Sequence, residues 1–140
     1  MAFTGNYTCN VFKTGILNGS FNFTSGSFYL ALYTNNATLN ADTTAYTTTG
    51  EASGGNYVAG GRLLTITQTP TIGPSGTTAY ISFGNVSWTG PITARGALIY
   101  KSGSNGAVCV LDFGSDKTST ASFTVQFPSA TNSSAIIRIS

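Results

Sequence analysis

The chain has 140 residues, enough for one domain with a substantial buried core. Its charged residues are few, six Lys or Arg and four Asp or Glu, and it has no histidine. Most acid–base catalysis and most metal sites depend on histidine or on grouped acidic and cysteine side chains. This composition therefore argues against an enzyme and favours a protein that holds or binds something, without a cofactor. The basic residues form no cluster, which argues against a nucleic-acid partner.

The first residues are polar and aromatic, and no stretch approaches the ~20 apolar residues of a membrane-spanning helix. We therefore expect no secretion signal, no membrane partner and synthesis in a cytosol. In that compartment the two cysteines, Cys9 and Cys109, are expected to be reduced and buried. Two cysteines without histidine are too few for a zinc site.

The first 20 residues contain the one predicted helix. Val11, Phe12, Ile16 and Leu17 recur at helical spacing, with Thr8 or Asn10 as the expected N-cap and Asn18-Gly19 as the stop signal. Gly15 weakens such a helix, so we expect about two turns that depend on packing against a sheet.

The rest of the chain reads as short strands with turns between them. The segment 27–33 is apolar on both faces, so it is either buried on both sides or in contact with another subunit. Tyr29 and Tyr33 of this segment are therefore candidate partner contacts. The other predicted strands are 62–68, 78–83, 86–88, 94–101, 107–113, 121–127 and 134–139.

The clearest hairpin joins the strands 94–101 and 107–113, with Asn105-Gly106 as its expected tight turn. Seven or eight short strands with such connections indicate an all-β fold. We therefore expect a single antiparallel β-sandwich of jelly-roll type spanning 1–140.

The segment 34–56 interrupts the strand pattern with a long, Thr-rich stretch whose large apolar residues are Leu39 and Tyr46. Loops of this length are usually functional or disordered. It is either a surface loop held down by Leu39 and Tyr46, or an arm that lies on a partner. Leu39, Tyr46 and Glu51 are therefore further candidate interface residues.

Asp112 and Asp116 are the one close pair of carboxylates. They could belong to a glycosidase site or to a calcium site, but Gly114-Ser115-Asp116-Lys117 is more typical of a solvated turn. The sequence therefore predicts no catalytic and no metal-ligating residue here.

Trp88, beside the Gly90-Pro91 turn, is the strongest recognition-like feature. It could stack on a sugar or anchor an interface, but covering the sandwich core is the favoured interpretation. Arg95 could form a salt bridge to a partner or cover apolar surface with its stem.

Several segments together resemble a family of small virion structural proteins of tailed bacteriophages, from about residue 8 to the end. The segments are FYLALYT (28–34), ATLNADTTAY (37–46), NYVAGG (56–61), ITARGALIY (92–100) and VLDFGSDK (110–117). Family members are described as capsid decoration (cement) proteins or as tail-associated proteins. The resemblance implies a small β-domain that sits as a homotrimer on the capsid lattice, assembled in the bacterial cytoplasm. The partners of such a domain would be the major capsid protein and further copies of itself. The resemblance implies no catalytic residues.

Two alternatives remain open. One is a carbohydrate-binding β-sandwich, such as a receptor-binding tail module, in which Trp88 and Tyr46 or Tyr57 would line an exposed groove. The other is a head–tail or tail-tube component, which would assemble as a ring.

Overall fold

The structure, a computed structural model, describes residues 3–74 and 76–140, which form strands and one helix. The prediction of an all-β antiparallel sandwich with a short N-terminal helix is confirmed. The elements are β1 (Tyr7–Thr8), α1 (Asn10–Asn18), β2 (Tyr29–Tyr33), β3 (Arg62–Leu63), β4 (Ile66–Ile72), β5 (Ala79–Phe83), β6 (Val86–Thr89), β7 (Ile92–Tyr100), β8 (Ala107–Ser119), β9 (Ser122–Val125) and β10 (Ile137–Ile139).

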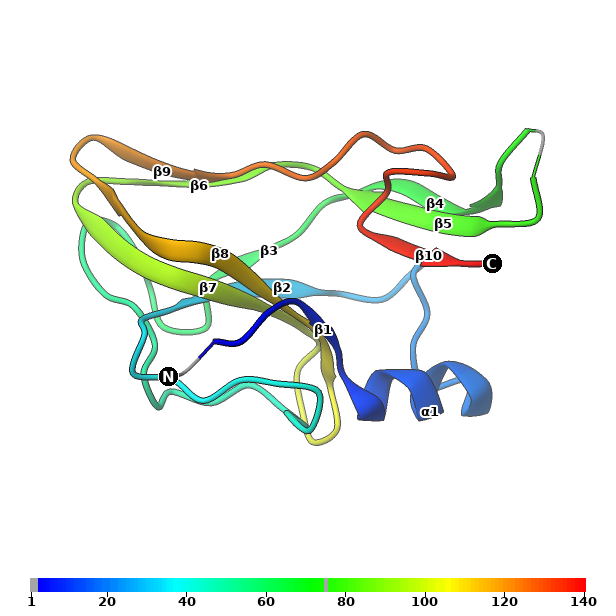
Figure 1. The fold of residues 1–140 in the computed structure, drawn as a ribbon, viewed down its shortest axis with the longest axis horizontal. Helices are drawn as coiled ribbons and strands as arrows, with labels where there is room; N and C mark the ends of the chain where they lie inside the picture. The colour runs from blue at the N-terminus through cyan, green and yellow to red at the C-terminus, as the bar shows by residue number, and fades with distance from the viewer. Residues whose placement is uncertain (1–2, 75) are drawn as a thin grey trace.

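The strands form two layers (Figure 1). One layer is a five-stranded sheet in the order β1-β8-β7-β2-β3. The other consists of the pair β6-β9 and the three-stranded sheet β10-β5-β4. Helix α1 lies at the end of the molecule occupied by β4, β5 and β10 (Figure 1). A single apolar core joins the layers, with Leu30 and Ile99 from the larger sheet and Phe83, Trp88 and Phe123 from the facing layer.

Strand β2 is buried on both faces, as its sequence predicts. Phe28, just before the strand, points to the facing layer, where its ring centroid lies 6.3 Å from that of Phe83. The opposite face carries Tyr33, whose hydroxyl donates a 2.7 Å hydrogen bond to the carbonyl of Thr47 in the long loop. The chain's own loop therefore covers the second face of β2, and no other subunit is needed to bury it.

Helix α1 runs over Asn10–Asn18 and ends at Gly19, whose φ of 80° is the left-handed conformation that glycine favours. The predicted N-cap is wrong: Cys9 occupies that position, and no side chain caps the helix. Gly15 is buried beneath the ring of Phe21, where a Cβ would collide with the ring. This close packing gives the glycine a structural role that outweighs its poor helix propensity.

The predicted strand 62–68 is divided between the two layers. β3 pairs with β2, whereas β4 pairs with β5 in the facing layer and extends to Ile72. The extension contains Pro70, which has no N–H to donate, and the pairing shifts register between Gln68 and Thr71. β4 is an edge strand, the position where a sheet tolerates proline.

The predicted turn at 114–117 is wrong, because β8 continues through it to Ser119. Gly96 of β7 pairs with Asp112, and Ala94 pairs with Lys117, so 113–116 bulge opposite the single residue Arg95. Gly114, with a φ of 85°, provides the left-handed conformation that the bulge requires. At the start of β8 the predicted hairpin is confirmed, but Asn105-Gly106 is not its two-residue turn. Residues 102–105 form the loop, with Asn105 at a φ of 57°, and Lys101 N donates a hydrogen bond to Gly106 O.

The segment 34–56 folds back on its own domain. This agrees with the first of its two interpretations, a surface loop held down by Leu39 and Tyr46. Leu39 is buried, and Glu51 forms an isolated bridge with Tyr33 of β2. The segment passes along the outer side of the five-stranded sheet, in cyan and blue-green in Figure 1. Leu39 and Tyr46 therefore hold it down within the chain.

Candidate functional site

The carboxylate of Glu51 is the centre of a cluster of hydrogen bonds between the long loop and the rest of the domain. Its Oε1 accepts a 2.6 Å hydrogen bond from the hydroxyl of Tyr46. Its Oε2 accepts one of 2.6 Å from the hydroxyl of Tyr57 and one of 2.7 Å from the N–H of Gly60. The hydroxyl of Tyr57 also accepts a 2.9 Å bond from the N–H of Leu32. The cluster therefore connects the long loop to β2 and to the glycine turn before β3.

Aromatic stacking extends this cluster across the sheet. The ring of Tyr100 lies between Tyr46, at a centroid distance of 5.0 Å, and Tyr29, at 5.7 Å. The Tyr100 hydroxyl donates a 2.6 Å bond to the carbonyl of Gly60. Stacked rings and charge-assisted hydrogen bonds both favour one fixed geometry. The cluster thus holds the loop against the sheet, and its carboxylate and hydroxyl groups are already hydrogen-bonded within the chain.

The surroundings keep these tyrosines protonated. Burial raises the pKa of Tyr57 far above its usual 10.0, and the hydrogen bond to Glu51 raises it further, since a phenolate there would face a carboxylate. The pKa of Tyr46 is raised by the same two causes, burial first and the hydrogen bond to Glu51 second. Burial also raises the pKa of Tyr33 and brings that of Tyr100 to about 12, with the charge of Glu51 adding to both.

Trp88 lies in the core, with a side chain only 1% exposed. Its ring centroid is 5.4 Å from that of Tyr57, and the guanidinium carbon of Arg62 lies 5.9 Å from it. The core-covering interpretation is confirmed. A sugar cannot stack on a ring that has no exposed face, so the role of Trp88 in a glycan groove is wrong.

Arg95 forms the one salt bridge among the described residues, from Nε to Oδ1 of Asp112 at 3.2 Å. The same carboxylate oxygen accepts a 2.8 Å bond from the N–H of Gly114. Both side chains are largely buried, so the pair holds β7 to the bulge of β8. Asp116 lies exposed on that bulge, whereas Asp112 is engaged by Arg95. Among the described residues, no three His, Cys, Asp or Glu side chains lie together as metal ligands would.

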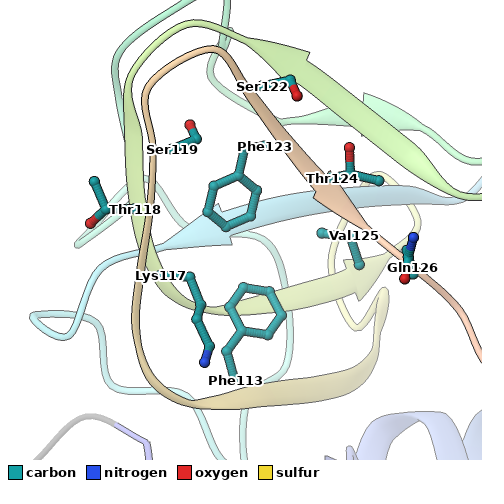
Figure 2. A pocket seen from close by; sticks show the side chains of 9 residues that line it. All are labelled: Phe113, Lys117, Thr118, Ser119, Ser122, Phe123, Thr124, Val125 and Gln126. Carbon is teal, nitrogen blue, oxygen red and sulfur yellow. The ribbon is translucent and has the colours of Figure 1, made fainter.

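Figure 2 shows a groove of about 460 Å³ between the bulge of β8 and strand β9. The rings of Phe113 and Phe123 point into it, 6.2 Å apart, and Lys117 lies beside Phe113. Its hydroxyls are mostly engaged elsewhere: Ser119 bonds to Gly90 and Ile92, Thr118 pairs with Thr93, and Thr124 pairs with Ser87. The polar side chains of Lys117, Ser122 and Gln126 also line the groove.

Both cysteines are buried free thiols, as expected. They lie close together, because Thr8 pairs with Cys109 and the N–H of Cys9 bonds to the carbonyl of Val108. Burial raises the pKa of Cys9 to about 11, against a smaller opposing effect of Lys13. Burial likewise raises that of Cys109 to about 12. Both thiols are therefore poor nucleophiles near neutral pH.

The candidate interface residues make contacts within the chain. Tyr33, Leu39 and Trp88 are at most 2% exposed, so the prediction that they contact a partner is wrong while the domain keeps this fold. Tyr29, Tyr46 and Glu51 are partly exposed but belong to the tyrosine cluster, and Arg95 is paired with Asp112.

Sequence reasoning missed the contributions of Tyr100 and Gly60, because neither stands near Glu51 in a recognisable motif. It named Tyr57 only as a candidate sugar contact. The one available signal was the concentration of tyrosine around an isolated acidic residue.

Comparisons with family models, with curated proteins and with solved structures find no match to this chain. Within the described residues, no helix has the length and apolar character needed to span a membrane.

Proposed function

We propose that this chain is a structural protein of a tailed-bacteriophage virion, acting as a capsid decoration protein that binds the capsid lattice and stabilises the head. The observation that carries the proposal is where the exposed apolar side chains lie. Leu63 and Ile72 are each 57% exposed on edge strands of different sheets, and Leu17, Val58 and Ile139 are more than half exposed elsewhere. Exposed apolar side chains and unpaired strand edges are typical of surfaces that other chains cover.

The chemistry of the domain supports the same proposal. The carboxylates of Glu51 and Asp112 are engaged in structural hydrogen bonds, and the buried thiols are kept protonated. The loop fastened by Glu51, the salt bridge of β8 and the continuous core suit a domain that must keep one shape under mechanical load. The proposal that the particle is a tailed-phage virion comes from the sequence resemblance to phage virion proteins.

The test is binding to expanded capsids that lack this protein, prepared from the phage that encodes it. We expect the purified chain to be a trimer by light scattering and to sediment with these capsids. We also expect decorated capsids to withstand higher temperature than bare ones. A monomer that leaves capsids untouched and unstabilised would contradict the proposal.

Carbohydrate binding has less support. That alternative placed Trp88 with Tyr46 or Tyr57 in an exposed groove, whereas Trp88 is buried and both tyrosine hydroxyls are bonded to Glu51.

A further inference from the structure

A cleft with an apolar floor separates helix α1 from the three-stranded sheet. Two adjoining hollows, of about 400 and 590 Å³, share the side chains of Phe12 and Ile16 from α1 and of Ile137 and Ile139 from β10. Phe21, Phe23 and Ile81 extend the floor of the first hollow. The first hollow is mainly apolar, whereas polar groups contribute more of the second. A concave apolar surface like the first is suited to receiving side chains of another molecule.

An exposed apolar row lies on the sheet side of the same cleft. Ile139, which is 51% exposed, pairs with Ala79, and Ala79 pairs with Ile72. These three residues thus form one row across β10, β5 and β4. Of the five exposed large apolar side chains of the described residues, Ile139 therefore lines the cleft and Ile72 lies in the same row.

The rim of the cleft is positively charged. Lys13 of α1 and Arg138 of β10 both line the second hollow. Lys101 lies with its Nζ 4.6 Å from the ring centroid of Phe21, which lines the first. No Asp or Glu side chain lines either hollow among the described residues. The cleft thus favours an occupant that combines apolar and acidic side chains.

A second copy of this chain has no such segment to offer. Glu51 and Asp112 are engaged in the tyrosine cluster and the salt bridge, and Asp42 accepts a hydrogen bond from Asn10. Asp116, on the β8 bulge, is followed directly by Lys117, which cancels its charge. Two clefts placed face to face would also bring Lys13 and Arg138 close to their own copies. The occupant is therefore a different polypeptide.

We infer that the cleft between α1 and β10 binds an acidic amphipathic segment of another virion protein. The apolar side chains of the segment fill the first hollow, and its carboxylates pair with Lys13 and Arg138 at the second. The inference rests on the proposed function in taking that protein to be part of the capsid. It assigns the capsid-facing side of the domain to the end that carries α1, β4 and β10.

Two matched pairs of variants test the inference by sedimentation with capsids that lack this protein. The double variant Lys13→Glu/Arg138→Glu reverses the rim, and Arg62→Glu/Lys117→Glu makes the same change of net charge away from the cleft. Ile139→Ser removes an apolar side chain of the cleft, and Ile139→Val, which keeps an apolar side chain at the same position, is its control. Thermal unfolding of all four variants checks that each still folds.

We expect the rim reversal to weaken capsid binding by about tenfold or more, since each new glutamate would repel a carboxylate of the bound segment. Ile139→Ser should weaken it by several fold, and both controls should bind as the wild type does. Equal binding by the cleft variants and their controls would overturn the inference and leave the proposed function standing. A wild-type chain that binds no capsid would overturn both.

Other occupants would give different results. If the cleft variants alter the mass of the free protein in light scattering and leave capsid binding unchanged, the cleft is filled by a second copy and the inference is wrong. It is also wrong if the wild-type chain binds phosphatidylglycerol vesicles and the rim reversal abolishes that binding with capsid binding intact.

Discussion

Tyr57 and Glu51, six residues apart in the sequence, are joined by a hydrogen bond of 2.6 Å between the tyrosine hydroxyl and Oε2 of the carboxylate. The same hydroxyl accepts the N–H of Leu32 on β2. One side chain therefore connects the last part of the long loop to the centre of the larger sheet. The loop owes its position to this connection and its neighbours, since it has no regular secondary structure of its own.

We expect Glu51→Gln to lower the free energy of unfolding by about 1–3 kcal/mol, because the amide cannot accept all three hydrogen bonds of the carboxylate. Denaturation in urea, followed by circular dichroism, measures the change. Asp116→Asn is the matched control, since Asp116 is exposed, and it should stay within about 0.5 kcal/mol of the wild type. Equal effects of the two substitutions would contradict the role assigned to Glu51.

The tyrosine cluster should make the fold sensitive to alkaline pH. The pKa of Tyr57 is higher in the folded chain than its usual 10.0, so above pH 10.0 the unfolded chain loses protons first. This contribution to stability is complete below that pH and is lost as pH rises towards the folded pKa. We expect the midpoint of urea unfolding to fall as pH rises from 10.0 to about 12, the pKa of Tyr100.

Tyr57→Phe removes one of the ionising groups, so the variant should be less stable at neutral pH and lose less stability on alkalinisation. Absorbance of tyrosinate, recorded along the same titration, reports the ionisation directly. A stability that stays flat over this range in the wild type would contradict the burial of these hydroxyls.

Neither cysteine should react with a thiol reagent in the folded protein. With pKa values raised to about 11 and about 12, Cys9 and Cys109 are thiols with very little thiolate at about pH 8. Both are also buried. We expect Ellman's reagent to release no colour from the native chain and two equivalents from the chain in guanidinium chloride. Fast reaction of either thiol without denaturant would show that β1 opens readily.

Gly15→Ala should destabilise the fold although alanine is the better helix former. Helix propensity alone would favour alanine by about 1 kcal/mol, but its Cβ would collide with the ring of Phe21. Thr14→Ala, at an exposed position one residue earlier, should change stability by less than about 1 kcal/mol. A more stable Gly15→Ala variant would show that Phe21 moves aside at little cost.

Trp88→Ala should lower the free energy of unfolding by about 3–5 kcal/mol, the usual loss when a large aromatic side chain is removed from a core. Thermal unfolding measures it, with Val58→Ala as the control because Val58 is 69% exposed. A variant that keeps its melting temperature would contradict the burial of Trp88.

The sequence was sufficient to predict the elements whose pattern is local. Alternating apolar residues identified β2, β5 and β9, and the glycine-rich turn before Ala107 identified the β7–β8 hairpin. Asn18-Gly19 marked the helix end correctly, because a left-handed C-cap depends on the residue that adopts it.

Features that depend on distant neighbours were not predictable. Gly-Ser-Asp-Lys has the composition of a turn, and only the pairing of Lys117 with Ala94 shows that the strand continues beyond a bulge. The tyrosine cluster joins Glu51 to residues from a loop, a turn and the end of β7, whose proximity is fixed by the sheets. Burial of Trp88 was expected, but its contacts with Tyr57 and Arg62 were not.

The pairing of β1 with β8 has a consequence for how the chain acquires its fold. The N–H of Asp112 bonds to the side chain of Asn6 across 106 residues, and β2 lies between β3 and the late strand β7. As the ribosome releases the chain, β2 emerges long before the strand that covers one of its edges. The apolar residues of β2 therefore stay exposed until β7 and β8 have been synthesised and can pair. Folding is therefore completed only once β7 and β8 are available, and at the slow rates of β-proteins with distant contacts, so the yield of folded protein depends on temperature and on chaperones.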